Sequence, residues 1–251
     1  MIKQLNFDIQ KPINDISKVT MLLYGTPKIG KSTFCSRFDD HFFIATENGL
    51  SHLETRNQLV TSWGEFLEVV GLLVEAKGKV KTIIIDTMDR LCDMLERELM
   101  KKYAVSCLND LAYGKGAALF GNEMKAALDA IQSLGCGLIF VSHAESIDIT
   151  TPTGTVKKWA PSLPKNARKL VLNAVDVIGF AECEYIINAG KTQEARVLHL
   201  APSQIWEAGD RTHRFPPKIP FKQAVFKAYF EGTIQSNAAA QAQQKVEVQN
   251  G

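Results

Sequence analysis

Runs of consecutive apolar residues recur along the chain and predict strands that are buried on both faces, as in a parallel sheet covered by helices. Each run is short, and Gly, Asp or another polar residue ends it. The runs are residues 18–24 (KVTMLLY), 41–46 (HFFIAT), 81–87 (KTIIIDT) and 137–142 (GLIFVS).

The segments between these runs carry apolar residues at the three- and four-residue spacing of amphipathic helices. Helices are predicted after Gly30, over 62–77, after Thr87, over about 119–134 and over 221–232. Alternation of buried strands with such helices predicts an α/β fold whose mainly parallel central sheet is flanked by helices.

The pattern changes beyond residue 175. Residues 175–187 and 195–200 are strand-like with only short loops between them, so antiparallel strands are predicted toward the C-terminus. We therefore expect one α/β domain over 18–232. An irregular lead-in over 1–17 precedes it, and a Gln-, Asn- and Ala-rich tail over 233–251 is predicted to be disordered.

Composition limits the class of protein. The 45% hydrophobic and 22% charged residues are typical of a globular protein and argue against a disordered, collagen-like or coiled-coil chain. Lys and Arg exceed Asp and Glu by only 29 to 27, so net charge alone does not decide whether a nucleic acid is bound.

Neither the cysteines nor the apolar segments point outside the cytoplasm. No CxxC pair occurs, so the sequence suggests neither a zinc site nor a disulfide framework, and the cysteines are interpreted as core residues. They are Cys35, Cys92, Cys107, Cys136 and Cys183. No signal-like run opens the chain and no stretch of 18 apolar residues occurs, which predicts a cytoplasmic protein without membrane contact.

The most specific motif is a glycine-rich phosphate-binding loop between the first strand and the first helix. It fits G-x-x-x-x-G-K-[ST] and consists of Gly25, Thr26, Pro27, Lys28, Ile29, Gly30, Lys31, Ser32 and Thr33. The backbone N–H groups of such a loop surround phosphates, Lys31 neutralises the β- and γ-phosphates, and the Ser32 hydroxyl binds Mg²⁺. The motif predicts ATP and Mg²⁺ as cofactors.

A magnesium ion held by one hydroxyl and phosphate oxygens needs a nearby carboxylate. Asp86 ends the apolar strand at 81–87 and is the predicted Walker B acid, although it could instead cap the following helix. Asp89, one turn further on, is interpreted as solvated or capping.

Hydrolysis also needs a group that orients or deprotonates the attacking water. Glu47 and His143 each follow a predicted strand directly, so both should emerge at the carboxyl edge of the sheet, where nucleotides bind. Either could equally be an ordinary loop residue.

The order of these motifs resembles the RecA/RadA core. The segments FFIATENGLSHL and VSHAES, with the stretch between residues 108 and 146, are similar to phage-encoded AAA-domain ATP-binding proteins, a group that includes single-strand annealing recombinases. The resemblance covers about residues 18–232. It implies that Glu47 activates water and that His143 senses the γ-phosphate where RecA has glutamine. It also implies a phage protein in the host cytoplasm that forms a ring or short filament.

The resemblance further implies DNA loops and a cation that enters the neighbouring subunit's ATP site. Arg211 is the candidate cation, with Arg214 and Lys191 as alternatives. Lys115 marks the first DNA loop. Residues 149–175, which contain no Asp or Glu, fall where the second DNA loop lies in the family. The basic and aromatic residues predicted to bind single-stranded DNA there are Lys157, Lys158, Trp159, Lys165, Arg168 and Lys169.

The predicted function is therefore a DNA-stimulated ATPase in phage DNA recombination or annealing, with a single-strand-binding protein as a further partner. Two alternatives remain open. One is an ATP-dependent loader or partner-clamping module in DNA replication. The other is a small-molecule kinase, which is disfavoured because no cluster of lid arginines is evident.

Overall fold

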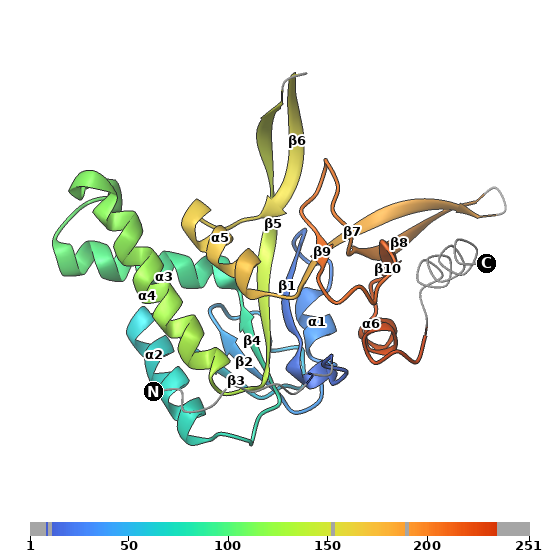
Figure 1. Ribbon diagram of the computed structural model, residues 1–251, viewed down its shortest axis with the longest axis horizontal. Coiled ribbons are helices and arrows are strands. Elements are labelled where there is room, and N and C mark those ends of the chain that lie inside the picture. The colour runs from blue at the N-terminus through green and yellow to red at the C-terminus, as the bar shows by residue number, and fades with distance from the viewer. Residues whose placement is uncertain (1–8, 10–11, 152–153, 189–190, 235–251) are drawn as a thin grey trace.

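The structure is a computed structural model that describes residues 9, 12–151, 154–188 and 191–234 (Figure 1). Most of the predicted lead-in and tail, 1–17 and 233–251, lies outside the described residues. The first described element is a 3₁₀ turn over Ile16–Lys18, in which the Asp15 side chain accepts the backbone N–H of Ser17.

In the described part of the chain, ten strands form a mixed sheet through the centre of the molecule. Their order is β10-β8-β7-β1-β5-β4-β2-β3, with β6 paired to β5 and β9 to β7. The pairs among β7, β1, β5, β4, β2 and β3 are parallel, and those made by β6, β8, β9 and β10 are antiparallel. The strands are β1 (Thr20–Gly25), β2 (His41–Ala45), β3 (Asn57–Leu59), β4 (Thr82–Asp86), β5 (Gly137–Thr151), β6 (Gly154–Pro161), β7 (Val177–Asn188), β8 (Lys191–His199), β9 (Gly209–Asp210) and β10 (Lys218–Pro220).

Helices cover both faces of this sheet. Short 3₁₀ turns at Leu108–Asp110 and Ala112–Gly114 lead into α4. The α-helices are α1 (Lys31–Cys35), α2 (Trp63–Glu75), α3 (Met88–Tyr103), α4 (Lys115–Gln132), α5 (Lys165–Ala174) and α6 (Gln223–Phe230). Figure 1 shows α2, α3, α4 and α5 on one side of the sheet and α1 and α6 on the other.

Alternation along the central strands divides the core between these two faces, because successive side chains of a strand point to opposite sides. In β1, Leu22 packs with α2, α3, α4 and α5, whereas Met21 and Leu23 pack with α1 and α6. All three side chains have no exposed surface. The uninterrupted apolar runs of the sequence are explained by this burial on both faces.

The fold class predicted from the sequence is confirmed: the sheet is mainly parallel and ends in antiparallel strands toward the C-terminus. The predicted helices over 62–77, 119–134 and 221–232 correspond to α2, α4 and α6. The expectation that all five cysteines are core residues is wrong, because Cys183 is exposed and Cys107 and Cys136 are only partly buried. Alternating strand positions put Cys183 on an open face of β7.

Most of the described part of residues 149–175, the segment expected to be a DNA loop, is strand or helix instead. β5 continues nine residues beyond the predicted strand end and pairs with β6 from Ala144↔Pro161 to Thr151↔Gly154, and α5 follows. We call residues 144–161 the β5–β6 arm. In Figure 1 this arm and the outer part of β7–β8 both project from the body of the molecule.

No helix among the described residues is long and apolar enough to cross a membrane.

Candidate active site

The phosphate-binding loop lies at the carboxyl end of β1 and has the backbone that such a loop requires. Gly30 has φ of 106°, in the left-handed region that favours glycine, and is the N-cap residue of α1. Gly25 is needed for a different reason. A Cβ at this position would lie 2.3 Å from the carbonyl oxygen of Ala181 on β7, so only glycine allows the two strands to approach this closely.

Lys31 is held inside the loop. Its side chain is buried, and its ammonium donates to the carbonyl oxygens of Gly25 and Thr26, both at 3.0 Å. Burial lowers the pKa of Lys31, and the negative charges of Asp86, Asp89 and Glu47 oppose this shift. The ammonium thus lies within the loop that would bind the phosphates, as the sequence motif predicts.

Ser32 and Asp86 meet across the gap between α1 and β4. The Ser32 hydroxyl donates to the Asp86 carboxylate (Oγ to Oδ2, 2.6 Å), and Asp86 is buried. Burial raises the pKa of Asp86, while the hydrogen bond from Ser32 lowers it. A hydroxyl and a carboxylate held this close fit the donor set for Mg²⁺ beside a nucleotide phosphate. The helix-cap alternative for Asp86 finds no support, since Thr87 is the N-cap residue of α3.

A pair of threonines joins the ends of two neighbouring strands. The Thr46 hydroxyl accepts the backbone N–H of Thr87 at 2.8 Å and lies 3.1 Å from the Thr87 carbonyl oxygen, to which it donates. Thr46 directly follows β2 and Thr87 directly follows β4, so this pair fixes the start of the loop that carries Glu47. Sequence reasoning missed Thr46, because a threonine after a strand carries no distinctive pattern.

Glu47 lies at the same sheet edge and remains accessible. Its side chain is 40% exposed, and its Oε2 is 3.7 Å from Nε of Arg90 on α3. Its negative charge raises the pKa of Asp86, although less than burial does. The charge of Glu47 therefore influences both Asp86 and Lys31, as expected for a residue that follows β2.

His143 has a partner that the sequence did not predict. Its Nδ1 lies 2.6 Å from Oδ2 of Asp89, and this hydrogen bond raises the pKa of His143. The second Asp89 oxygen, Oδ1, is buried and has no hydrogen-bond partner among the described residues. Asp89 is neither solvated nor a cap, so that interpretation of the sequence is wrong. The first turn of α3 places Asp89 beside His143, midway along β5.

A pocket of about 470 Å³ adjoins the phosphate loop on the α1 side of the sheet. Arg196 of β8 reaches into this region, with Nη1 only 3.4 Å from the position that a Cβ on Gly30 would occupy. Phe221 lines the same pocket and stacks on Phe34 of α1, with ring centroids 4.8 Å apart. Arg196 was not predicted, because β8 is far from the loop in sequence.

The proposed trans cation lies away from this site. Arg211 follows β9 and its Nη1 is 3.3 Å from Oδ1 of Asp176, the residue before β7, at the amino edge of the sheet. The phosphate loop is at the opposite, carboxyl edge, so Arg211 does not serve the ATP site of its own chain. Arg214 donates to the Phe230 carbonyl and to Asn14. The side chain of Lys191 lies outside the described residues.

The predicted DNA-binding residues lie on β6, on α5 and at the start of α4, and they differ in exposure. Lys157, Lys165 and Lys169 are exposed. Arg168 instead pairs with Glu145, and Lys158 lies 4.0 Å from Glu207.

Trp159 is 38% exposed and packs on Phe180, with ring centroids 6.2 Å apart. Lys115, the first-loop candidate, begins α4 with its ammonium 5.6 Å from the centre of the Tyr103 ring. Lys115 therefore belongs to a different part of the surface from Trp159.

The mixed sheet, the phosphate loop and the Ser32–Asp86 pair together define a P-loop NTPase with an α/β fold. Residues 17–212 match the family described as the AAA domain. The chain belongs to this family.

Two solved structures resemble the chain at low sequence identity. A KaiC-like protein of the archaeon Pyrococcus horikoshii is 12% identical, with a TM-score of 0.47 over 81% of this chain and 85% of that one. The flagellar accessory protein FlaH of Methanocaldococcus jannaschii is 11% identical, with a TM-score of 0.43 over 81% and 84%. No curated protein matches the chain significantly.

Proposed function

We propose that this protein binds ATP with Mg²⁺, hydrolyses it, and couples hydrolysis to binding of single-stranded DNA in recombination or annealing. The observation that carries the ATP part is the contact of Ser32 with Asp86 beside the buried ammonium of Lys31. These groups form a site for a divalent cation and for phosphate charge at the carboxyl ends of β1 and β4, which lie on either side of β5.

The residues have separable tasks in this proposal. Lys31 would leave the loop carbonyls and neutralise phosphate charge, and Ser32 and Asp86 would hold Mg²⁺. Glu47 would orient or deprotonate the attacking water. His143, held by Asp89, would donate to the γ-phosphate. The nucleotide base would occupy the pocket beside Arg196 and Phe221, where an aromatic ring and a cation adjoin the loop.

The DNA part rests on the exposed lysines of β6 and α5. Five basic residues between 154 and 175 exceed the two acids of the opposing strand segment, Glu145 and Asp148. Exposed cations that neutralise phosphates release counter-ions, and an aromatic ring such as that of Trp159 can stack on a base. In this proposal the protein acts as a ring or short filament, and Arg211 completes the ATP site of the neighbouring subunit.

A second function is favoured by one observation: part of the basic face is already paired within the chain, Arg168 with Glu145 and Lys158 with Glu207. A projecting arm with balanced charges also suits a protein partner, as in an ATP-dependent loader or clamping module. In that case DNA would leave the ATPase rate unchanged.

The deciding experiment measures ATP turnover with and without single-stranded oligonucleotide, in wild type and in Lys31→Ala. We expect turnover in wild type, its stimulation by DNA, and a loss of about 10²-fold or more in Lys31→Ala, because the phosphates lose their cation. Lys79→Ala, which removes an exposed lysine elsewhere, is the matched control.

Undiminished turnover in a folded Lys31→Ala protein would contradict the ATP site. Turnover that is indifferent to DNA would contradict the DNA coupling alone and support the partner-clamping function.

A further inference from the structure

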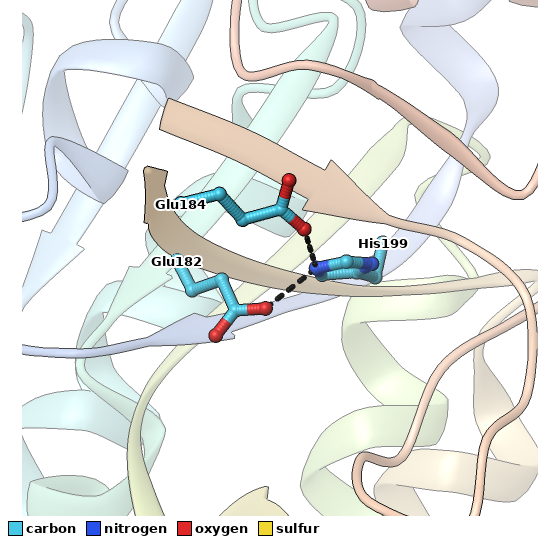
Figure 2. Close-up of side chains that lie close together, drawn as sticks. All are labelled: Glu182, Glu184 and His199. Carbon is cyan, nitrogen blue, oxygen red and sulfur yellow. Dashed lines mark hydrogen bonds and ion pairs between the residues drawn. The ribbon is translucent and has the colours of Figure 1, made fainter. Parts of the chain in front are cut away.

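Three side chains capable of binding a metal converge where β7 and β8 leave the body of the molecule (Figure 2). Glu182 and Glu184 come from β7 and His199 comes from the end of β8, and their ligand atoms all lie within 4.8 Å of one another. Both glutamates approach the same ring nitrogen. Nε2 of His199 is 2.7 Å from Oε1 of Glu182 and 3.4 Å from Oε1 of Glu184.

The strand geometry explains why these three residues meet. Glu182 and Glu184 are two positions apart on β7, so both side chains project from the same face of the sheet. β8 runs antiparallel to β7, with His199 opposite Phe180, which also lies on this face. The cluster is thus formed by two strands joined by many backbone hydrogen bonds and not by a loop.

The imidazole is held in place by packing. His199 is only 4% exposed, and its ring stacks on Trp206 and Phe180 with centroid distances of 4.0 and 5.9 Å. The ammonium of Lys218 on β10 is 2.7 Å from Oε2 of Glu184 and leaves Oε1 directed at the histidine. The ring and one carboxylate are therefore already oriented, which lowers the entropy lost on binding a ligand.

The two glutamates compete for one donor atom of the histidine, Nε2. A single N–H on Nε2 can serve one carboxylate well, and the two contact lengths differ accordingly. The second glutamate brings another negative charge toward a buried ring, offset by Lys218 alone among the described contacts of the cluster. A divalent cation in place of that proton would bind all three donor groups and neutralise both carboxylates.

We propose that Glu182, Glu184 and His199 bind a first-row transition-metal dication, with Zn²⁺ as the best match. Nε2 of His199 lies 3.4 Å from Oε1 of Glu184, within the roughly 3–3.5 Å that separates adjacent ligands at a metal with bonds of about 2.0–2.2 Å. The 2.7 Å to Oε1 of Glu182 is a hydrogen-bond length, so this carboxylate would move slightly away when a metal replaces the proton between the two atoms. An imidazole with two carboxylates suits Zn²⁺ or Mn²⁺, whereas Mg²⁺ and Ca²⁺ favour oxygen alone. Water would complete the coordination.

This site is separate from the Mg²⁺ site at Ser32 and Asp86 but is joined to the same strands. Ala181, which precedes Glu182, pairs with Gly25 at the start of the phosphate loop. A metal that links β7 to β8 at this level would stiffen the base of the projecting β7–β8 pair and the strand that contacts the loop.

The test is equilibrium binding of Zn²⁺ to chelator-treated, nucleotide-free protein, in competition with a chromophoric chelator. Without nucleotide, Ser32 and Asp86 lack the phosphate oxygens that help to hold a cation. Tight Zn²⁺ binding to this protein would therefore report on the cluster at His199 and not on Ser32 and Asp86. We expect one equivalent of Zn²⁺ per chain, and a loss of affinity of about 100-fold or more in His199→Gln. Because Trp206 stacks on His199, the fluorescence of Trp206 should change on Zn²⁺ binding and should saturate at the same Zn²⁺ concentration.

Two further variants distinguish loss of the metal site from misfolding of the protein. Glu182→Gln changes a partly exposed residue and should also weaken Zn²⁺ binding, with an unchanged circular dichroism spectrum. Glu194→Gln alters an exposed acid of β8 outside the cluster and should bind as wild type does. If wild type binds Zn²⁺ no more tightly than a folded Glu182→Gln protein, the cluster is an ion pair of His199 with its glutamates and the proposal is wrong.

Discussion

At the scale of single residues, the site depends on carboxylates in different surroundings. Asp86 is buried against Ser32, Asp89 holds His143, and Glu47 stays 40% exposed with Arg90 nearby. An accessible carboxylate can exchange protons with water, whereas a buried one is better placed to hold a cation. The surroundings therefore support the proposed roles of Glu47 in proton transfer and of Asp86 in holding the metal.

Glu47→Gln should retain ATP binding and lose hydrolysis by about 10²–10⁴-fold, since only the carboxylate can accept a proton from water. Nucleotide affinity by fluorescence and single-turnover hydrolysis measure the two effects. Glu54→Gln, in the same loop region and exposed, is the control. Normal hydrolysis in Glu47→Gln would transfer the role to another group near the phosphates.

Asp89→Asn should lower the pKa of His143, because the hydrogen bond to Asp89 is the largest cause of its elevation above 6.5. The neighbouring charges of Lys31 and Glu47, which act in opposite directions, remain in this variant. A group whose pKa is higher in the folded than in the unfolded state stabilises the folded protein. This stabilisation is complete at pH values below the unfolded-state pKa and is lost as the pH rises through the folded-state pKa.

Urea denaturation of wild type and Asp89→Asn from about pH 5.5 to 8.5 checks this prediction. The difference in unfolding free energy should be largest at the acid end and shrink toward the alkaline end. Asp93→Asn, an exposed change on the same helix, should show no such trend. A difference independent of pH would mean that Asp89 acts through packing alone.

At the scale of elements, the β5–β6 arm is where sequence and structure differ most. Residues 149–175 contain no acid, so the sequence suggested a basic loop. The arm pairs Lys157 with Asp148, which lies one residue before that window. A charge count along the chain misses charges that the opposing strand supplies. The extension of β5 was not predicted as a strand because it is polar, contains acids and has no apolar run.

If the exposed lysines bind DNA, the triple variant of Lys157, Lys165 and Lys169 to Ala should weaken single-strand binding and reduce the log–log salt slope by about 2. Arg168 is left intact because its removal would leave Glu145 without its ion-pair partner. Oligonucleotide anisotropy at several salt concentrations gives the slope. A control that removes the exposed Lys77, Lys79 and Lys101 has the same net charge and should bind normally. Equal slopes in the two triple variants would remove DNA from the function of this face.

At the scale of the whole molecule, the class of fold was predictable because burial on both faces of a parallel sheet produces uninterrupted apolar runs that have the length of a strand. The phosphate loop, Asp86 and Glu47 were predictable because the ends of parallel strands share one edge. Arg196, Asp89 and the cluster at His199 were not predictable. Each depends on which strands are neighbours, and one sequence does not state that order.

The strand order also determines when the protein can fold during synthesis. β1 is made first among the strands, yet its two hydrogen-bonded neighbours are β5 and β7, and Gly25 meets Ala181 only after some 150 further residues have been added. At ordinary translation rates this interval is on the order of ten seconds. For most of that time, until β5 has been made, this apolar strand has no partner in the sheet. The nascent chain should therefore depend on chaperones for most of its synthesis, and the ATP site should form only after β7 has emerged from the ribosome.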